Sequence, residues 1–182
     1  MKFNKKLLIS ALFGFSLFSF TPNAMADAQS DFAQAYQYIE QGNYHQAFPI
    51  FQQLAEQGYA SVQFNLALMY ENGQGVRQDY AQAVKWYKAA AEQGEANAQV
   101  NLGVMYANGE GVKQDYVQAV KWFKAAAEQG YAKGQFTLGV MYKFGLGVPQ
   151  NDQLAKEWFG KACNNGDQLA CDQYRELNEQ GK

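Results

Sequence analysis

The chain has 182 residues, of which 15 are basic and 17 acidic, so its formal net charge is −2. An acidic chain without a cluster of lysines and arginines is a poor candidate for binding nucleic acid or an anionic membrane surface. One histidine and two cysteines are also few ligands for a metal site. Composition therefore argues against nucleic acid and an anionic membrane surface as partners, and we expect no metal and no cofactor.

The first 26 residues differ in character from the rest of the chain. Three lysines precede an apolar run over residues 7–20, which is short for a membrane span, and an A-x-A pattern ends at Ala26. This arrangement predicts a cleaved secretory signal peptide and an exported protein, in the periplasm or the medium. An uncleaved membrane anchor is the alternative. Cleavage leaves 12 basic and 17 acidic residues, a net charge of −5.

Residues 27–59 look like a shortened copy of the units that follow. The second half, from Ala47 to Gly58, matches residues 83–94 at an offset of 36, whereas the first half matches the later units only at an offset of 32. Four residues are therefore missing from the loop between the two halves, and Gly42 supplies a tight turn there. We predict a degenerate helical N-terminal cap over 27–59.

The next part of the chain repeats itself. Tyr70, Tyr106 and Tyr142 are 36 residues apart, and tryptophans and glycines recur at the same interval. A fixed period of this length indicates stacked supersecondary units that bury surface between neighbours. The predicted divisions are repeat 1 at 60–95, repeat 2 at 96–131, repeat 3 at 132–166 and a C-terminal capping helix within 167–182.

Each repeat has the pattern of a helix hairpin. In the second repeat Ala98, Leu102 and Tyr106 follow the spacing of one helical face. Two glycines then end the first helix, and Asp115 is placed as the N-cap of the second helix. The G-x-G elements are interpreted as turns between helices, because they lack the strand and the lysine of a phosphate-binding loop. We interpret the periodic aromatic residues as core rather than as a carbohydrate platform.

The pattern A-x3-LG-x2-Y-x2-G-x-GV-x2-D-x3-A-x2-W-x3-A-x3-G, carried by residues 98–130, resembles the Sel-1-like repeat, a relative of the tetratricopeptide repeat. The resemblance covers about residues 60 to 166, and the tight turn of the cap is similar to that of a tetratricopeptide unit. It implies an all-α, right-handed helical solenoid. It also implies a scaffold or adaptor for proteins or extended peptides, without naming the partner.

The two cysteines, Cys163 and Cys171, lie late in one predicted helix and early in the next. Across a tight helix hairpin their side chains could meet, so an exported chain favours a disulfide over two free thiols. The bond would pin the last helix, Asp167 to Glu179, over the end of the array. The C-x7-C spacing resembles the secreted cysteine-rich branch of the family, in which such pairs recur in most repeats, whereas it occurs once here.

Some members of that branch are associated with binding or slow hydrolysis of β-lactams, so a cell-wall or β-lactam hydrolase is the alternative function. The composition argues against an enzyme. After cleavage the chain keeps two serines, Ser30 and Ser61, and neither opens an S-x-x-K motif. Nothing in the sequence places the single histidine, His45, near either serine. A third possibility is a non-catalytic regulator of a peptidoglycan enzyme.

The resemblance implies that the first helix of each repeat lines a concave binding surface. An asparagine ladder can pair with a peptide backbone, and apolar neighbours can take its side chains. The alternative is that these residues pack between helices or cap them. The predicted contacts are one apolar row of Phe64, Val100 and Phe136, a second of Leu68, Val104 and Val140, a polar row of Asn65, Asn101 and Thr137, and an extension by Phe32 and Tyr36.

Charges at the ends of the same helices differ from repeat to repeat. Glu71, Ala107 and Lys143 occupy equivalent positions, so the predicted groove would run from acidic to basic. Such a gradient could orient a bound peptide, although an exposed charge contributes at most about 1 kcal/mol.

Overall fold

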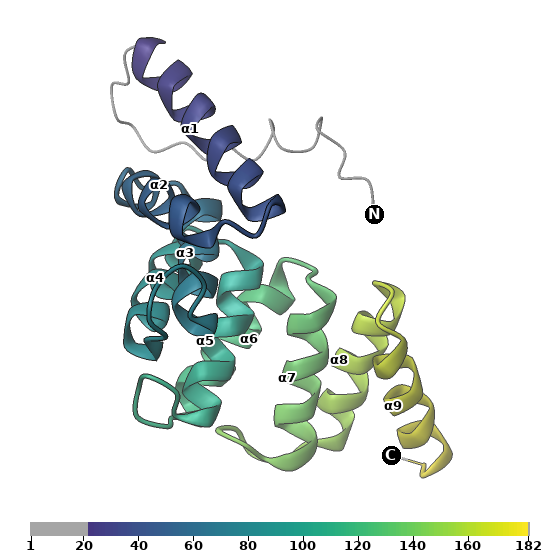
Figure 1. Cartoon of the computed structure of the whole chain (residues 1–182). Helices are drawn as coiled ribbons and strands as arrows, with labels where there is room; N and C mark the ends of the chain where they lie inside the picture. Colours follow the sequence, from purple (N-terminus) through teal and green to yellow (C-terminus); the bar gives the residue numbers. More distant parts are fainter. Residues whose placement is uncertain (1–21, 182) are drawn as a thin grey trace. The chain divides into compact units, whose positions relative to one another are not determined.

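The computed structural model describes residues 22–181, and this part of the chain is helical without β-strands. Its helices are labelled in Figure 1. They are α1 Pro22–Glu40, α2 Tyr44–Glu56, α3 Ala60–Asn72, α4 Tyr80–Glu92, α5 Ala96–Asn108, α6 Tyr116–Glu128, α7 Ala132–Phe144, α8 Asp152–Asn164 and α9 Gln168–Glu179. The prediction of an all-α fold of repeated helix hairpins is confirmed.

The predicted signal peptide, 1–26, lies mostly in residues 1–21, outside the described part of the chain. Helix α1 begins at Pro22, so the predicted boundary between signal peptide and cap falls within this helix. The chain divides into two compact units, Met1–Ala90 and Ala91–Lys182, and the division falls in α4.

Local sequence signals set the helix ends. The Asp115 side chain accepts a hydrogen bond from the Gln118 N–H at 3.0 Å, which satisfies one of the free donors at the start of α6. Helix α5 ends at Gly109, whose φ of 75° lies in the left-handed region that favours glycine. Equivalent N-caps are formed by Asp79 and Asn151, and equivalent C-caps by Gly73 and Gly145.

The second glycine of the G-x-G turn has a positive φ, and its lack of a side chain lets the turn lie close to the backbone of another helix. At Gly147, with φ of 70°, an added Cβ would lie 2.4 Å from the backbone oxygen of Tyr116. In the first unit, a Cβ at Gly75 would lie 2.2 Å from the backbone oxygen of Tyr44. Each loop therefore rests on the start of the second helix of the preceding hairpin, and the interpretation of G-x-G as an interhelical turn is confirmed.

Alanine and aromatic side chains form the core of the first unit. Helix α1 packs on α2, and α2 packs on α3. The fully buried Phe51 ring lies 5.5 Å, centroid to centroid, from the ring of Tyr36 on α1. Ala35 and Ala47 have no exposed surface, which lets the helices of this hairpin lie close together.

In the second unit each helix from α5 to α9 packs on the next. Glycines in the first helices make room for aromatic rings on the second helices. A Cβ at Gly139 would lie 2.8 Å from the fully buried ring of Phe159, and one at Gly103 would lie 2.5 Å from the ring of Phe123. A larger residue at either glycine would overpack the hairpin.

Candidate functional site

The predicted contact residues of the first unit lie on α3, except for Phe32 and Tyr36, which lie on α1. Phe64, Asn65 and Leu68 are each half-buried. The Phe64 ring centroid lies 5.8 Å from that of Tyr87, whose side chain is fully buried. This apolar side chain therefore has two roles, since part of it packs on α4 and part remains accessible.

Asn65 is already engaged within the first unit. Its side-chain amide donates to the hydroxyl oxygen of Tyr36 at 2.8 Å and to the backbone oxygen of Ser61 at 2.7 Å. Burial raises the pKa of the Tyr36 hydroxyl above its ordinary value, although the hydrogen bond from Asn65 opposes the rise. Both amide hydrogens of Asn65 are thus used internally, so this residue would present its Oδ1 acceptor to a peptide.

The predicted contact residues of the second unit differ in accessibility. Val104, Phe136 and Val140 are half-buried on α5 and α7, and Asn101 is half-buried on α5. Val100, in contrast, has no exposed surface, because it packs in the core cluster with Phe123 and other residues of α6. Its placement in a ligand-facing row is therefore wrong.

Thr137 also makes hydrogen bonds within its own helix. Its hydroxyl lies 2.9 Å from the backbone oxygen of Lys133 and 3.0 Å from that of Gly134. The polar row is consequently not a ladder of open amides. Thr137 directs its hydroxyl donor to carbonyl groups of its own helix, while Asn65 directs its donors to the Ser61 carbonyl and the Tyr36 hydroxyl.

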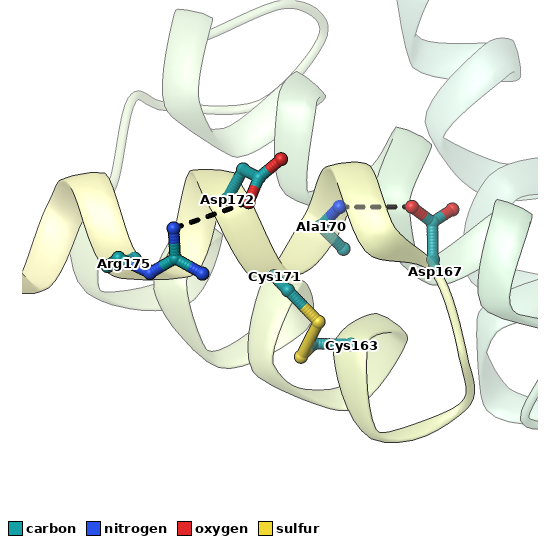
Figure 2. Close-up of a disulfide and its surroundings, with 6 residues drawn as sticks. All are labelled: Cys163, Asp167, Ala170, Cys171, Asp172 and Arg175. Atoms are coloured by element: carbon teal, nitrogen blue, oxygen red, sulfur yellow. Dashed lines mark hydrogen bonds and ion pairs between the residues drawn. A yellow bond between two sulfur atoms is a disulfide. The ribbon is translucent and has the colours of Figure 1, made fainter.

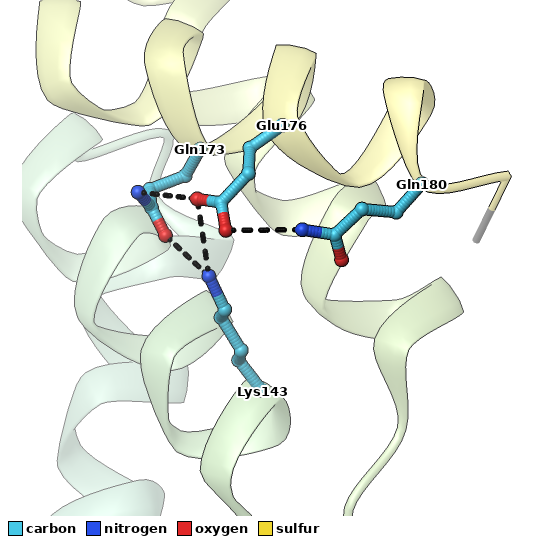
Figure 3. A network of polar contacts seen from close by, with 4 residues as sticks. All are labelled: Lys143, Gln173, Glu176 and Gln180. Carbon is cyan, nitrogen blue, oxygen red and sulfur yellow. Dashed lines mark hydrogen bonds and ion pairs between the residues drawn. The ribbon is translucent and has the colours of Figure 1, made fainter.

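The charges at the ends of α3 and α7 have partners inside their own units. Glu71 accepts a hydrogen bond from the Tyr87 hydroxyl. Lys143 Nζ lies 2.8 Å from Gln173 Oε1 and 3.4 Å from Glu176 Oε2, so α7 is joined to α9 (Figure 3). These contacts give the charges a structural role, and the predicted gradient is not made of free charges.

The two cysteines are joined. Cys163 on α8 and Cys171 on α9 form a disulfide, and their Cα atoms are 4.6 Å apart (Figure 2). The Asp167 side chain accepts a hydrogen bond from the Ala170 N–H at 3.0 Å and so caps α9. The predicted disulfide and the predicted terminal helix are both confirmed.

A known family model matches most of this chain. The Sel1 repeat model matches residues 35–59, 60–95, 96–131 and 132–167. The chain belongs to the Sel1 repeat family. The first match lies within the predicted cap, which is thus recognised as a Sel1 repeat in its own right. Sel1 repeat proteins are generally protein-interaction scaffolds.

Three solved structures are similar to this Sel1 repeat protein. A protective antigen of uropathogenic Escherichia coli strains, with an SLR fold, is 45% identical, with a TM-score of 0.81 over 85% of this chain and 34% of that chain. A Sel1 repeat protein from Oxalobacter formigenes is 32% identical, with a TM-score of 0.76 over 83% and 60%. Helicobacter pylori cysteine rich protein B is 25% identical, with a TM-score of 0.54 over 76% and 93%.

The chain therefore spans 34% of the length of the first of these structures and 60% of the second. No curated protein matches it.

A buried glutamine that the sequence analysis did not single out links successive Sel1 repeats. Gln135 on α7 is 4% exposed, and its Nε2 donates to the backbone oxygen of Ala127, near the end of α6, at 3.1 Å. The carbonyl groups of the last turn of a helix lack partners within that helix, so this bond satisfies one of them. Gln99 makes the same bond to Ala91 at 3.1 Å, and Gln63 to Ala55 at 3.0 Å.

The residues considered for catalysis make hydrogen bonds within the fold. His45 is exposed in the first turn of α2, with Nδ1 3.0 Å from the backbone oxygen of Gly75. Ser61 is half-buried on α3, and its backbone oxygen accepts from Asn65. Within the described residues no group of three or more His, Cys, Asp or Glu side chains could hold a metal ion. No observation on these residues favours the hydrolase alternative.

Proposed function

We propose that this Sel1 repeat protein is an exported, non-catalytic scaffold that binds a protein or an extended peptide on the accessible faces of its first helices. The observation that carries the proposal is a set of half-exposed apolar side chains on α5 and α7. These two helices are in contact in the second unit, and Val104 on α5 and Val140 on α7 occupy equivalent positions.

Phe144, at the end of α7, extends this apolar surface. Its side chain is 63% exposed, and accessible aromatic residues are common anchors in interfaces. The equivalent positions in the two preceding repeats hold asparagines, Asn72 and Asn108. The third repeat thus carries an aromatic group where the repeat pattern itself does not require one.

The chemistry of this surface fits a partner with apolar side chains. Val104, Phe136 and Val140 would receive them, while Phe144 would cover the end of the bound segment. Val100 belongs to the supporting core and is not part of the proposed contact set. In the first unit, Asn65 Oδ1 would act as an acceptor for a backbone N–H of the partner, with Phe64 and Leu68 beside it.

Three observations support export. The predicted signal peptide has the composition of a secretory leader, and a disulfide is typical of proteins in oxidising compartments. A relative that is 45% identical is described as a protective antigen, which fits a protein that immune molecules can reach.

Site-specific photo-crosslinking in the native host tests this proposal. A probe at Val104 should give a discrete adduct. A probe at Val117 on α6, whose side chain is 63% exposed, should not give this adduct. Phe144→Asn restores the residue type of the other repeats, so it should leave the fold intact and weaken the Val104 adduct. The proposal fails if Val104 gives no adduct, or if both probes give the same adducts.

A further inference from the structure

Cys171 and Cys163 occupy the positions that a glutamine and an alanine hold in the earlier repeats. Moving 36 residues along the chain takes Gln135 to Cys171 and Ala127 to Cys163. In α3, α5 and α7 the glutamine donates to the backbone of a residue eight positions earlier. In α9 a covalent bond spans the same interval of eight residues. The disulfide therefore takes the place of the buried hydrogen bond that fixes the other first helices.

The remaining packing of α9 on the second unit is limited. Its buried side chains are Ala170 and Leu177, which join the core cluster of α8 around Phe159. The apolar or small residues at 138–140 of α7 are replaced in α9 by Tyr174, Arg175 and Glu176. Arg175 and Glu176 are exposed and charged, so they add little apolar contact between α9 and the rest of the second unit. The docking of α9 therefore depends more on the disulfide than the docking of α7 depends on its glutamine.

Helix α9 also contributes to the core cluster that borders the surface proposed for binding. Phe136 and Val140 pack against the same cluster to which Ala170 and Leu177 of α9 contribute. Lys143 points toward α9 and is held there by Gln173 and Glu176 (Figure 3). Release of α9 would therefore expose more of Phe136 and Val140 and would free the ammonium group of Lys143.

We propose that the Cys163–Cys171 disulfide is a thiol-controlled latch that sets how much of the α7 surface a partner can reach. A dithiol reductant attacks the disulfide, and its own two thiols become a disulfide while Cys163 and Cys171 take up two electrons and two protons. Both cysteines are half-buried rather than fully enclosed, so a small thiolate can reach the bond. Reduction undocks α9 and leaves α5–α8 folded. This inference rests on the proposed function, because the surface that opens adjoins the proposed contact residues.

Hydrogen–deuterium exchange of the full chain tests the latch without any partner. The chain has two cysteines, so dithiothreitol acts on this bond alone. Amides of α9 should exchange at least ten-fold faster after reduction, while those of α5 and α6 stay unchanged. The double variant Cys163→Ser/Cys171→Ser should behave like the reduced protein and should not respond to dithiothreitol. Equal protection of α9 in the oxidised and the reduced protein would overturn the latch. A rise in amide exchange over α5–α9 together would overturn it as well.

Carbene footprinting gives a second readout that separates the latch from the proposed function. Labelling of Phe136 and Val140 should rise at least two-fold on reduction, while Val104 and Val117 stay constant. Unchanged labelling of Phe136 and Val140 would overturn the latch and leave the proposed function intact, because the Val104 adduct does not require α9 to move. If labelling of Phe136 and Val140 rises as expected but the Val104 probe gives no adduct, the result would count against the proposed function alone.

Discussion

Asn165 donates its side-chain amide to Oε1 of Gln135 at 2.8 Å, while Gln135 donates its own amide to the backbone of Ala127 at 3.1 Å. The Asn165 amide also reaches the backbone oxygen of Gly130 at 3.1 Å. The buried side chain of Gln135, near the start of α7, thus connects the end of α6 with the end of α8. Gln99 has a similar arrangement, since Gln129 donates to its Oε1 at 2.8 Å.

Replacing this amide without changing its volume should weaken the second unit. We expect Gln135→Met to lower the free energy of unfolding by about 1 to 3 kcal/mol, because the Ala127 carbonyl and the Asn165 amide lose a buried partner. Gln153→Met, at an exposed position of α8, is the matched control and should change stability little. Urea unfolding measures both. A loss no larger in Gln135→Met than in the control would mean that water or other groups replace the amide.

The hairpins and the disulfide could be predicted from the sequence because they rest on local signals repeated several times. Caps such as Asp115, turn glycines such as Gly109 and the cysteine spacing each act within a few residues. The burial of the proposed contact residues was harder to predict. Helical spacing assigns Val100 and Val104 to the same face of α5, but only the packing of α6 shows that Val100 is covered. Gln135 was missed because a polar residue in a surface helix suggests exposure.

The equivalence of Gln135 with Cys171 leads to a second disulfide. We expect Ala127→Cys/Gln135→Cys to form one spontaneously, since this pair has the register of Cys163 and Cys171. The closed loop should contribute about 2 to 3 kcal/mol by the chain-entropy model, offset by about 1 to 3 kcal/mol for the lost hydrogen bonds of Gln135. Peptide mapping under non-reducing conditions detects the bond.

The control for the engineered bond is Glu128→Cys/Gln135→Cys. Glu128 is exposed, and a shift of one residue turns the side chain by about 100° around the helix axis, so this pair should stay reduced. Free thiols at 127 and 135 under oxidising conditions would show that the shared register does not give a shared geometry.

Two turn glycines should respond differently to alanine. Gly147 and Gly166 both have positive φ, 70° and 92°, so alanine costs about 1 to 2 kcal/mol of backbone strain at each. At Gly166 a Cβ has no atom within 4 Å, whereas at Gly147 it would lie 2.4 Å from the Tyr116 oxygen. Gly147→Ala should therefore destabilise by about 1 to 3 kcal/mol more than Gly166→Ala. Equal losses in thermal and urea unfolding would mean that the loop can lift away from α6 at no cost.

The Tyr36 hydroxyl should make the first unit sensitive to alkali. Burial raises its pKa in the folded chain above the ordinary value of 10.0. Below pH 10 the hydroxyl is protonated in both states, and its contribution to stability is fully present. As the pH rises above this value, the unfolded chain releases the proton first, so stability falls until the pH passes the raised pKa.

Removing this hydroxyl should reduce that alkaline loss. We expect Tyr36→Phe to be less stable than the wild type at pH 7 by about 1 kcal/mol, because the Asn65 amide loses its acceptor. Between pH 7 and pH 11 the difference should shrink, since the variant lacks the titrating group. Tyr80→Phe, at a side chain that is 39% exposed, serves as the control and should follow the wild-type slope. Urea midpoints across this range measure the effect, and parallel curves for wild type and Tyr36→Phe would show that the buried hydroxyl does not govern it.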